Sequence, residues 1–281
     1  MSNPERNIDQ STVDGFGSEW SKFNYHSDGE DDIQRIFPDY FGMFPFATLP
    51  HGARCLDVGC GTGRWSLCAA PLVGEVHLLD ASADALGVAK ENFSRRRLTN
   101  VVFHHVDLES FSPDGNFDAA WSLGVLHHLP NTGLAIKKVA SLLTAGAPFL
   151  VYLYYRFDNR PIWFKALWNM SNLMRLIVCR LPRVLRLLIC DILALVVYWP
   201  IARMAQLMAY VGVSSNRIPL SYYSDKSFYV MRNDALDRFG TRLEQRFTRN
   251  EIQEMLEAAG FEKVCFSDKE PFWVALCYKR G

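Results

Sequence analysis

The chain has 281 residues, of which 49% are apolar and 21% charged, enough to bury one large core or two modest ones. Thirty basic residues balance thirty acidic ones, and a molecule without net positive charge lacks the field that non-specific nucleic-acid binding requires. We therefore expect no nucleic-acid partner. The seven cysteines include no C-x-x-C pair, which predicts reduced core thiols in a cytoplasmic protein and no metal site. The polar, acidic first residues predict no secretory signal.

Charge is unevenly distributed along the chain. Residues 1–60 carry ten acids against four bases, whereas residues 160–212 carry seven bases against a single acid, Asp191. Such asymmetry predicts two surfaces with different partners.

Residues 1–52 precede the first predicted strand and contain an aromatic cluster, FGSEWSKFNYH, at 16–26. Trp20 and Phe23 are three residues apart, a spacing that would place both on one face of a helix packed on the sheet.

Short apolar runs alternate with amphipathic stretches between residues 53 and 154. The runs are rich in Val, Leu and Phe and predict buried strands at 53–58, 75–80, 101–106, 117–122 and 147–154. The stretches between them predict helices at 64–72, at 84–94 after Ser82, and at 131–143 opened by Asn131 or Thr132. Strands that alternate with helices in this way predict a parallel sheet covered on both faces.

The pattern stops over 155–245 and returns at 246–281. Thr248 and Glu251 have the spacing of a capping box, Gly260 should end that helix, and two strands follow. The turn between the two strands is too short for a crossover, so they should be antiparallel. The predicted fold class is α/β: a Rossmann-like, seven-stranded, mostly parallel sheet with an antiparallel carboxy-terminal hairpin and an inserted helical cap.

The first strand ends in LDVGCGTG at 56–63, where Asp57 precedes three glycines at alternate positions. A dinucleotide fingerprint would need a glycine where Arg64 stands, and the G-K-[ST] of a P-loop is absent. A carboxylate at this point would repel a pyrophosphate and attract a ligand with cationic centres. The loop therefore predicts a positively charged nucleoside ligand beyond the carboxyl ends of the strands.

These residues resemble the class I S-adenosylmethionine-dependent methyltransferases, whose first motif is an acid followed by G-x-G-x-G and whose ligand carries a sulfonium and an ammonium. The resemblance covers 53–154 and 246–281. It implies that Asp80 contacts the ribose hydroxyls and Asp107 the adenine amino group. The implied cofactor is S-adenosyl-L-methionine, and the residues implied to bind it are Asp57, Gly59, Gly61, Gly63, Asp80, Ala81, Asp107, Leu108, Ser122 and Leu123.

Two adjacent histidines, His127 and His128, follow the fourth predicted strand. Adjacent side chains point in different directions, so at most one should face the reacting methyl group. If the acceptor is a hydroxyl, that histidine would be the general base, and the alternative is a structural role. Methyl transfer is an in-line displacement that alignment and exclusion of water can accelerate, so a catalytic side chain is not required.

The resemblance also suggests roles for the two additions to the core. Residues 1–52 would form a lid over the cofactor, and residues 155–245 would form a largely helical substrate cap. The candidate substrate residues are Trp20, Tyr25, Tyr222 and Tyr223.

Within the insertion, an apolar stripe from Trp163 to Leu181 has helical spacing, and Pro182 should end that helix. Residues 184–199 are apolar nearly all round, and Pro200 should close this second helix. Its charges and the short uncharged run at 192–202 argue against a bilayer crossing.

Three alternatives stay open for residues 160–212. They are an internal cap or homodimer interface, a tunnel for a greasy substrate, and a peripheral contact with a membrane that carries anionic lipids. The last rests on four arginines at one end of the helices: Arg175, Arg180, Arg183 and Arg186.

The leading hypothesis is a methyltransferase that acts on a hydrophobic small molecule of lipid, quinone or polyketide type, in the cytoplasm or at the inner face of the membrane. One alternative is a non-catalytic cofactor-binding or membrane-interaction protein that keeps the fold. Another is a nucleotide-dependent oxidoreductase, which would bind a nicotinamide cofactor in preference to S-adenosylhomocysteine.

Overall fold

The computed structural model describes residues 7–22, 30–212 and 218–281. These residues divide into two compact units. The core unit comprises 7–22, 33–158 and 243–281, and the insertion unit comprises 30–32, 159–212 and 218–242.

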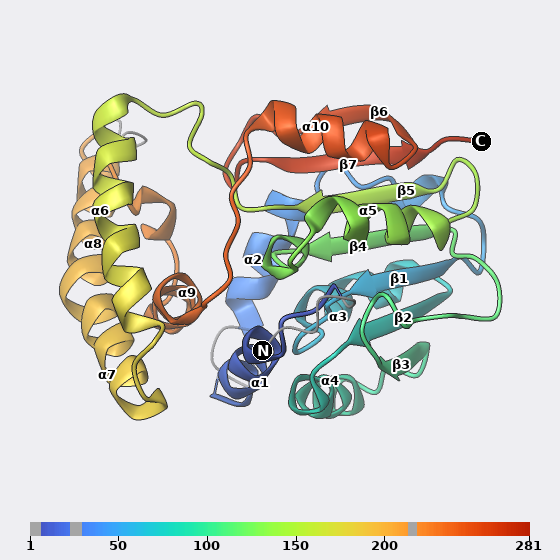
Figure 1. The fold of residues 1–281 in the computed structure, drawn as a ribbon, viewed down its shortest axis with the longest axis horizontal. Coiled ribbons are helices and arrows are strands. Elements are labelled where there is room, and N and C mark those ends of the chain that lie inside the picture. The colour runs from blue at the N-terminus through green and yellow to red at the C-terminus, as the bar shows by residue number, and fades with distance from the viewer. Residues whose placement is uncertain (1–6, 23–29, 213–217) are drawn as a thin grey trace. The chain divides into compact units, whose positions relative to one another are not determined.

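The core unit is built on one seven-stranded sheet with the order β3-β2-β1-β4-β5-β7-β6 (Figure 1). Neighbouring strands are parallel except for the two pairs that involve β7. The order reverses between β1 and β4, which is where ligands bind in open α/β sheets. The predicted fold class is thus confirmed. The strands are β1 (Arg54–Val58), β2 (Glu75–Asp80), β3 (Val101–His105), β4 (Ala119–Leu123), β5 (Pro148–Tyr152), β6 (Phe261–Phe266) and β7 (Val274–Lys279).

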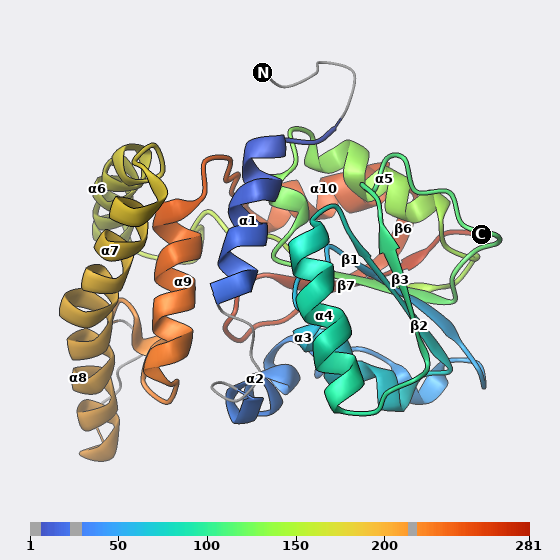
Figure 2. The ribbon, with the colours of Figure 1, turned by 90° about the horizontal axis from the view of Figure 1, so that it is seen from below.

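Helices pack on both faces of this sheet (Figures 1 and 2). α3 and α4 lie together on one side, while α5 and α10 lie together on the other and bury side chains such as Ile136 and Ile252. The predicted caps are present: Ser82 opens α4, Asn131 opens α5, and the Thr248 capping box opens α10. The helices are α3 (Arg64–Ala69), extended by a 3-10 turn η2 (Ala70–Leu72), α4 (Ala83–Arg95), α5 (Thr132–Ser141) and α10 (Arg249–Ala258).

Helices α1 (Gln10–Lys22) and α2 (Glu30–Phe41) precede β1, and a 3-10 turn η1 (Phe46–Thr48) follows them. α1 packs closely on the start of α4, because a Cβ at Gly17 would lie 2.6 Å from Ser82 Oγ. Phe41 and Phe44 pack edge-on against Trp121 in β4. This part of the amino-terminal segment is therefore integral to the packing of the core unit.

The insertion unit is helical, and its α9 packs against both α6 and α7. Its elements are α6 (Ile162–Val178), α7 (Arg183–Leu193), a π-helical segment η4 (Ala194–Tyr198), α8 (Trp199–Tyr210), a 3-10 turn η5 (Ser221–Tyr223) and α9 (Phe228–Gly240).

The prediction that Pro200 closes a helix is wrong, because α7, η4 and α8 form one continuous helix from Arg183 to Tyr210. A proline inside an α-helix lacks an amide proton, and its ring clashes with the carbonyl four residues earlier. Here the wider π-helical turn 194–198 comes directly before α8 and gives the ring room.

All seven cysteines are free thiols, but not all lie in the core. Cys265 is exposed and Cys68 is half-buried, so the expectation of core thiols is wrong for these two. Cys265 lies in β6, at the edge of the sheet, where alternate side chains face solvent.

Candidate active site

The glycine loop follows β1, and its path depends on three residues in the left-handed region. Gly59, Gly61 and Gly63 have φ angles of +73°, +55° and +71°. Space is short as well: a Cβ would lie 2.3 Å from Val125 Cγ1 at Gly59 and 3.0 Å from Phe93 Cε2 at Gly63. No residue with a side chain would therefore preserve this loop.

Asp80, at the end of β2, anchors the loop. Its Oδ2 accepts a hydrogen bond from the Gly61 amide at 2.9 Å, and its Oδ1 accepts one from the Ser82 amide at 2.8 Å. Burial raises the pKa of this carboxyl, and the two amides act in the opposite direction. Ala81 lies between these contacts, with its carbonyl oxygen 3.2 Å from His105 Nε2. An acceptor group thus stands at the carboxyl edge of β1 and β2, where a ligand is expected.

Asp57 does not offer the open carboxylate that the charge argument expected. It is only 2% exposed, and its Oδ2 accepts a hydrogen bond from Ser66 Oγ in α3 at 2.6 Å. Burial raises the pKa of this carboxyl to about 7, against the effect of the Ser66 hydrogen bond. In this structure Asp57 ties α3 to β1, and a salt bridge to a bound cation would need the carboxyl to rearrange.

Asp107 and Leu108 follow β3 and are half-buried. The Asp107 carboxylate accepts hydrogen bonds from the amide and the hydroxyl of Ser110, each at 3.0 Å, which is the capping geometry of a turn. Ser122 in β4 is fully buried and donates to the Val58 carbonyl at 2.9 Å, beside the nearly buried Leu123. Their contacts with a cofactor stay predictions.

Aromatic side chains gather beside the glycine loop. Trp20 of α1 lies against it, since a Cβ at Gly61 would be 3.1 Å from Trp20 Nε1. The Arg64 guanidinium carbon lies 4.9 Å from the ring centroid of Trp20 and 5.0 Å from that of Trp65. A cation is thus held between two indoles at the start of α3.

From Trp65 the contacts continue through three tyrosines. Tyr40 of α2 lies 4.7 Å from Trp65 and 5.3 Å from Tyr152 between ring centroids, and Tyr152 lies 5.9 Å from Tyr154. Tyr152 ends β5 and Tyr154 follows two residues later, so the alternation of side chains along an extended chain points both the same way.

The series closes on itself through a histidine. Tyr154 lies 5.6 Å from His128, which lies 4.8 Å from Phe16, and Phe16 is stacked 6.5 Å from Trp20. We call this closed series of contacts the aromatic belt. Its members are Phe16, Trp20, Tyr40, Arg64, Trp65, His127, His128, Tyr152 and Tyr154.

His127 and His128 lie in a 3-10 turn, η3 (Leu126–His128), directly after β4. The expectation that they diverge is wrong: both are buried, their ring centroids are 4.0 Å apart, and both rings contact Tyr154. Although consecutive residues of a 3-10 turn leave the backbone in different directions, the two imidazoles share a neighbour because the Tyr154 ring packs against both.

The two histidines differ in their polar contacts. His128 Nδ1 lies 2.7 Å from the Leu243 carbonyl oxygen. Neither ring nitrogen of His127 has a hydrogen-bond partner among the residues that the structure describes. Burial, reinforced by the nearby charges of His128 and Arg246, lowers the pKa of His127 well below its ordinary value. Its imidazole is therefore neutral at neutral pH.

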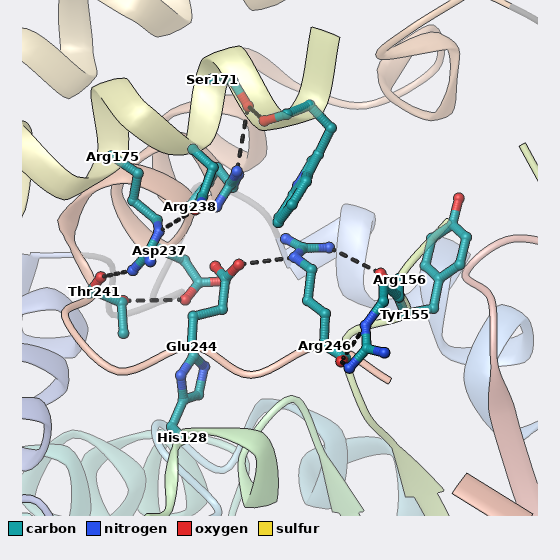
Figure 3. A network of polar contacts seen from close by, with 12 residues as sticks. His128, Tyr155, Arg156, Ser171, Arg175, Asp237, Arg238, Thr241, Glu244 and Arg246 are labelled. Carbon is teal, nitrogen blue, oxygen red and sulfur yellow. Dashed lines mark hydrogen bonds and ion pairs between the residues drawn. The ribbon is translucent and has the colours of Figure 1, made fainter. Parts of the chain in front are cut away.

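The chain returning to the core at Leu243–Phe247 fixes this arrangement. The Gln245 amide donates to the His127 carbonyl at 3.1 Å, and the Phe247 amide donates to the Tyr154 carbonyl at 2.9 Å. The Arg246 guanidinium carbon lies 5.0 Å from the Tyr154 ring centroid, and Arg246 Nε is 2.8 Å from the nearly buried Glu244 carboxylate (Figure 3).

Sequence reasoning missed several of these residues. Tyr152 and Tyr154 could have been predicted from the fifth strand, because residues i and i+2 of a strand lie on the same face. The others come from separate elements and had none: Tyr40, Trp65, Glu244 and Arg246.

The predicted substrate residues fall in three places. Trp20 belongs to the aromatic belt, and Tyr25 lies outside the described residues. Tyr222 and Tyr223 lie in η5 of the insertion unit, where Tyr223 packs 5.4 Å from Tyr198 between ring centroids. Their roles toward a substrate stay predictions.

The raised pKa of Asp57 predicts a pH dependence of stability. The contribution of the Asp57 carboxyl to the free energy of unfolding is fully present below the ordinary carboxyl pKa. It is lost as pH rises through about 7, and the loss amounts to up to about 4 kcal/mol. Asp57→Asn should therefore make thermal unfolding less sensitive to pH between about 4 and about 7. Asp114→Asn, at an exposed aspartate, is the matched control and should follow the parent protein. Identical pH profiles for all three proteins would contradict the assignment.

A family model described as "Methyltransferase domain" matches residues 55–146. The chain is similar to 27-O-demethylrifamycin SV methyltransferase of Amycolatopsis mediterranei, with 31% identity over 42% of this chain and 43% of that protein. It is also similar to a ubiquinone biosynthesis O-methyltransferase of Xanthomonas axonopodis, with 29% identity over 50% of this chain and 59% of that protein. The chain spans less than two thirds of the length of these curated relatives.

A solved structure shares the fold along nearly the whole chain. It is magnesium protoporphyrin IX methyltransferase from Synechocystis with S-adenosylhomocysteine bound, at a TM-score of 0.54, with 14% identity and 96% of each chain covered. The matched segment 55–146 begins in β1 and ends two residues before β5, so it contains the glycine loop, Asp80 and both histidines. Residues 55–146 are therefore similar to methyltransferase domains in sequence, and the chain shares the fold of a methyltransferase of known structure along nearly its whole length.

Proposed function

We propose that this protein transfers a methyl group from S-adenosylmethionine to a hydroxyl of a hydrophobic small molecule. The observation that carries the proposal is that the glycine loop contacts the aromatic belt. The Gly61 amide donates a hydrogen bond to Asp80, and Gly61 packs against Trp20. When bound, S-adenosylmethionine supplies an electrophilic methyl group on a positively charged sulfur.

The residues present fit that cofactor. The three glycines add no side chains of their own to the loop, and the Asp80 carboxylate at its edge is an acceptor suited to ribose hydroxyls. The Tyr40 ring, next to Trp65 and Tyr152, offers a negative face to a cationic sulfur, whereas Arg64 already lies against the rings of Trp20 and Trp65. Closely packed aromatic groups also exclude water, which otherwise competes as the acceptor.

His127 supports a hydroxyl acceptor. A buried imidazole without a hydrogen-bond partner costs about 1–3 kcal/mol, so its place in the belt calls for a function. In the proposed reaction the acceptor oxygen forms a bond to the methyl carbon as the carbon–sulfur bond breaks, leaving S-adenosylhomocysteine. His127 takes up the hydroxyl proton, so charge and atoms balance.

The aromatic belt also supports a hydrophobic, ring-containing acceptor, because aromatic faces bind flat apolar groups while tyrosine hydroxyls orient polar substituents. The two curated relatives are named for a rifamycin and for ubiquinone biosynthesis. We extend that class of acceptor to this protein as part of the proposal.

Cofactor choice is the first test. Calorimetry should give an affinity for S-adenosylhomocysteine on the order of micromolar, about −8 kcal/mol, and no measurable affinity for NAD. Equal binding of both ligands would favour the oxidoreductase alternative. Binding without methyl transfer to any hydrophobic hydroxyl compound tested would favour the non-catalytic alternative.

Gly61→Ala tests the loop. The new Cβ would press on Trp20 and add the strain of a positive φ, so S-adenosylhomocysteine affinity should fall by more than about tenfold. Gly146→Ala is the matched control, because Gly146 has a φ of +80° but open space around its Cβ position. It should share the loss of stability and keep the affinity. Equal affinity in both variants would mean that the loop does not hold the cofactor.

The histidine pair provides the catalytic test. His127→Phe should lower turnover by roughly 10²–10⁴ while leaving the melting temperature unchanged or higher, since it removes an unsatisfied buried group. His128→Phe should do the reverse, because it breaks the contact with Leu243. The parent's turnover should also stay level as pH falls through the ordinary histidine pKa, because the pKa of His127 is lower still. Near-full turnover in His127→Phe would assign the reaction to positioning alone.

A further inference from the structure

The continuous helix from Arg183 to Tyr210 presents a wide apolar face to solvent. Three leucines along it, Leu188, Leu195 and Leu207, are 54, 56 and 64% exposed. Val184, Ile192, Val196, Trp199 and Tyr210 extend the same exposed surface. Large apolar patches of this kind on soluble domains mark sites of contact with a partner or a membrane.

Three of the four charged side chains of this helix contact other residues of the insertion unit. Asp191 accepts two hydrogen bonds from Arg232 of α9, each at 3.0 Å. Arg186 donates to the Gly240 carbonyl at 3.4 Å, and Arg203 donates to the Lys226 carbonyl at 2.7 Å. Of the four charged residues in the helix, only Arg183 at its start is exposed.

α6 repeats this arrangement within the same unit. Arg175 is buried and donates to the Thr241 carbonyl at 2.9 Å (Figure 3). It also donates to the Arg242 carbonyl at 3.1 Å. Ile162, Met170 and Ile177 are among its exposed apolar residues. The sequence predicted a basic end of these helices made of four arginines. Two of the four are exposed, Arg180 and Arg183, and they lie on either side of Pro182.

The helix is long and apolar enough to cross a bilayer by length and composition alone: it has 28 residues, and its most apolar stretch has a mean hydropathy of 2.1 with 17% of that stretch buried. A crossing would place the side that holds Arg186, Asp191 and Arg203, with their partners, in hydrocarbon. A helix that lies in the plane of the interface buries only its apolar face and leaves the charged side in protein.

We propose that the exposed faces of α6 and α7–α8 dock the protein on a lipid bilayer, with the long helix parallel to the membrane plane. The exposed apolar side of the helix suits the acyl region of a bilayer, and its charged side contacts protein. Arg180 and Arg183, at the turn between the helices, suit anionic lipid headgroups. A second copy of this chain would instead present the same uncharged face to itself and leave these two arginines without acids opposite them. The surface is independent of the methyl-transfer proposal.

The test is cosedimentation of the full chain with vesicles of phosphatidylcholine, alone or mixed with phosphatidylglycerol. The parent protein should bind, and the triple variant Leu188→Gln, Leu195→Gln, Leu207→Gln should lose at least about tenfold of its partitioning. The matched control changes two leucines of similar exposure in the core unit, Leu72→Gln and Leu134→Gln, and should bind like the parent. Arg180→Gln with Arg183→Gln should lower binding by about fivefold per arginine, only on anionic vesicles at low salt.

Calorimetry with S-adenosylhomocysteine on the same variants separates this proposal from the enzymatic one, because the triple variant should keep its affinity. Absence of vesicle binding by the parent, or equal binding by the triple variant, would overturn the proposal. So would self-association of the parent in sedimentation velocity that the triple variant abolishes without any lipid binding, because the face would then join two copies.

Discussion

The hydrogen bond from the Gly61 amide to the Asp80 carboxylate is the constraint on which the site depends. It joins the loop after β1 to the end of β2, and it requires a backbone path that only glycine follows at 59, 61 and 63. With the loop held there, Trp20 can lie against Gly61, and the aromatic belt closes around the same edge of the sheet. This contact between the loop and the end of β2 thus lies beside groups that come from five separate segments.

The sequence allowed the sheet and its helices to be predicted because their signals are local. Buried strands are continuous apolar runs, and Ser82, Asn131 and Thr248 mark helix starts through bonds to amides within three residues. The glycine loop was recognisable for the same reason. The inward turn of Asp57 was not, because the charge argument considered the ligand and not the hydroxyl of Ser66, which competes for the same carboxylate.

The belt and the long helix could not be read locally. Tyr40, Tyr154 and Phe16 join the belt through His128 and Tyr152 only after separate segments pack together, and their spacing in the chain does not indicate those contacts. Pro200 has a strong local meaning, but a π-helical turn directly before it cancels the steric conflict on which that meaning rests. In the same helix the hydrophobic pattern showed apolar residues nearly all round. Only the partners of Arg186, Asp191 and Arg203 distinguish one side from the other.

The two chain segments that lead out to the insertion unit and back from it are paired in the core unit. Tyr155 and Phe247 form a parallel bridge, and the Arg156 amide donates to the Phe247 carbonyl at 2.8 Å, so exit and return lie one strand spacing apart. An insertion whose ends meet in this way can change in length or sequence without moving β5 or α10, since closing a short gap costs the core little. Substitutions within the inserted helices therefore need not alter the packing of the core unit. Tyr154 and Arg246 directly precede the two bridged residues, so a change in the insertion that displaced this bridge would alter the candidate site first at these two side chains.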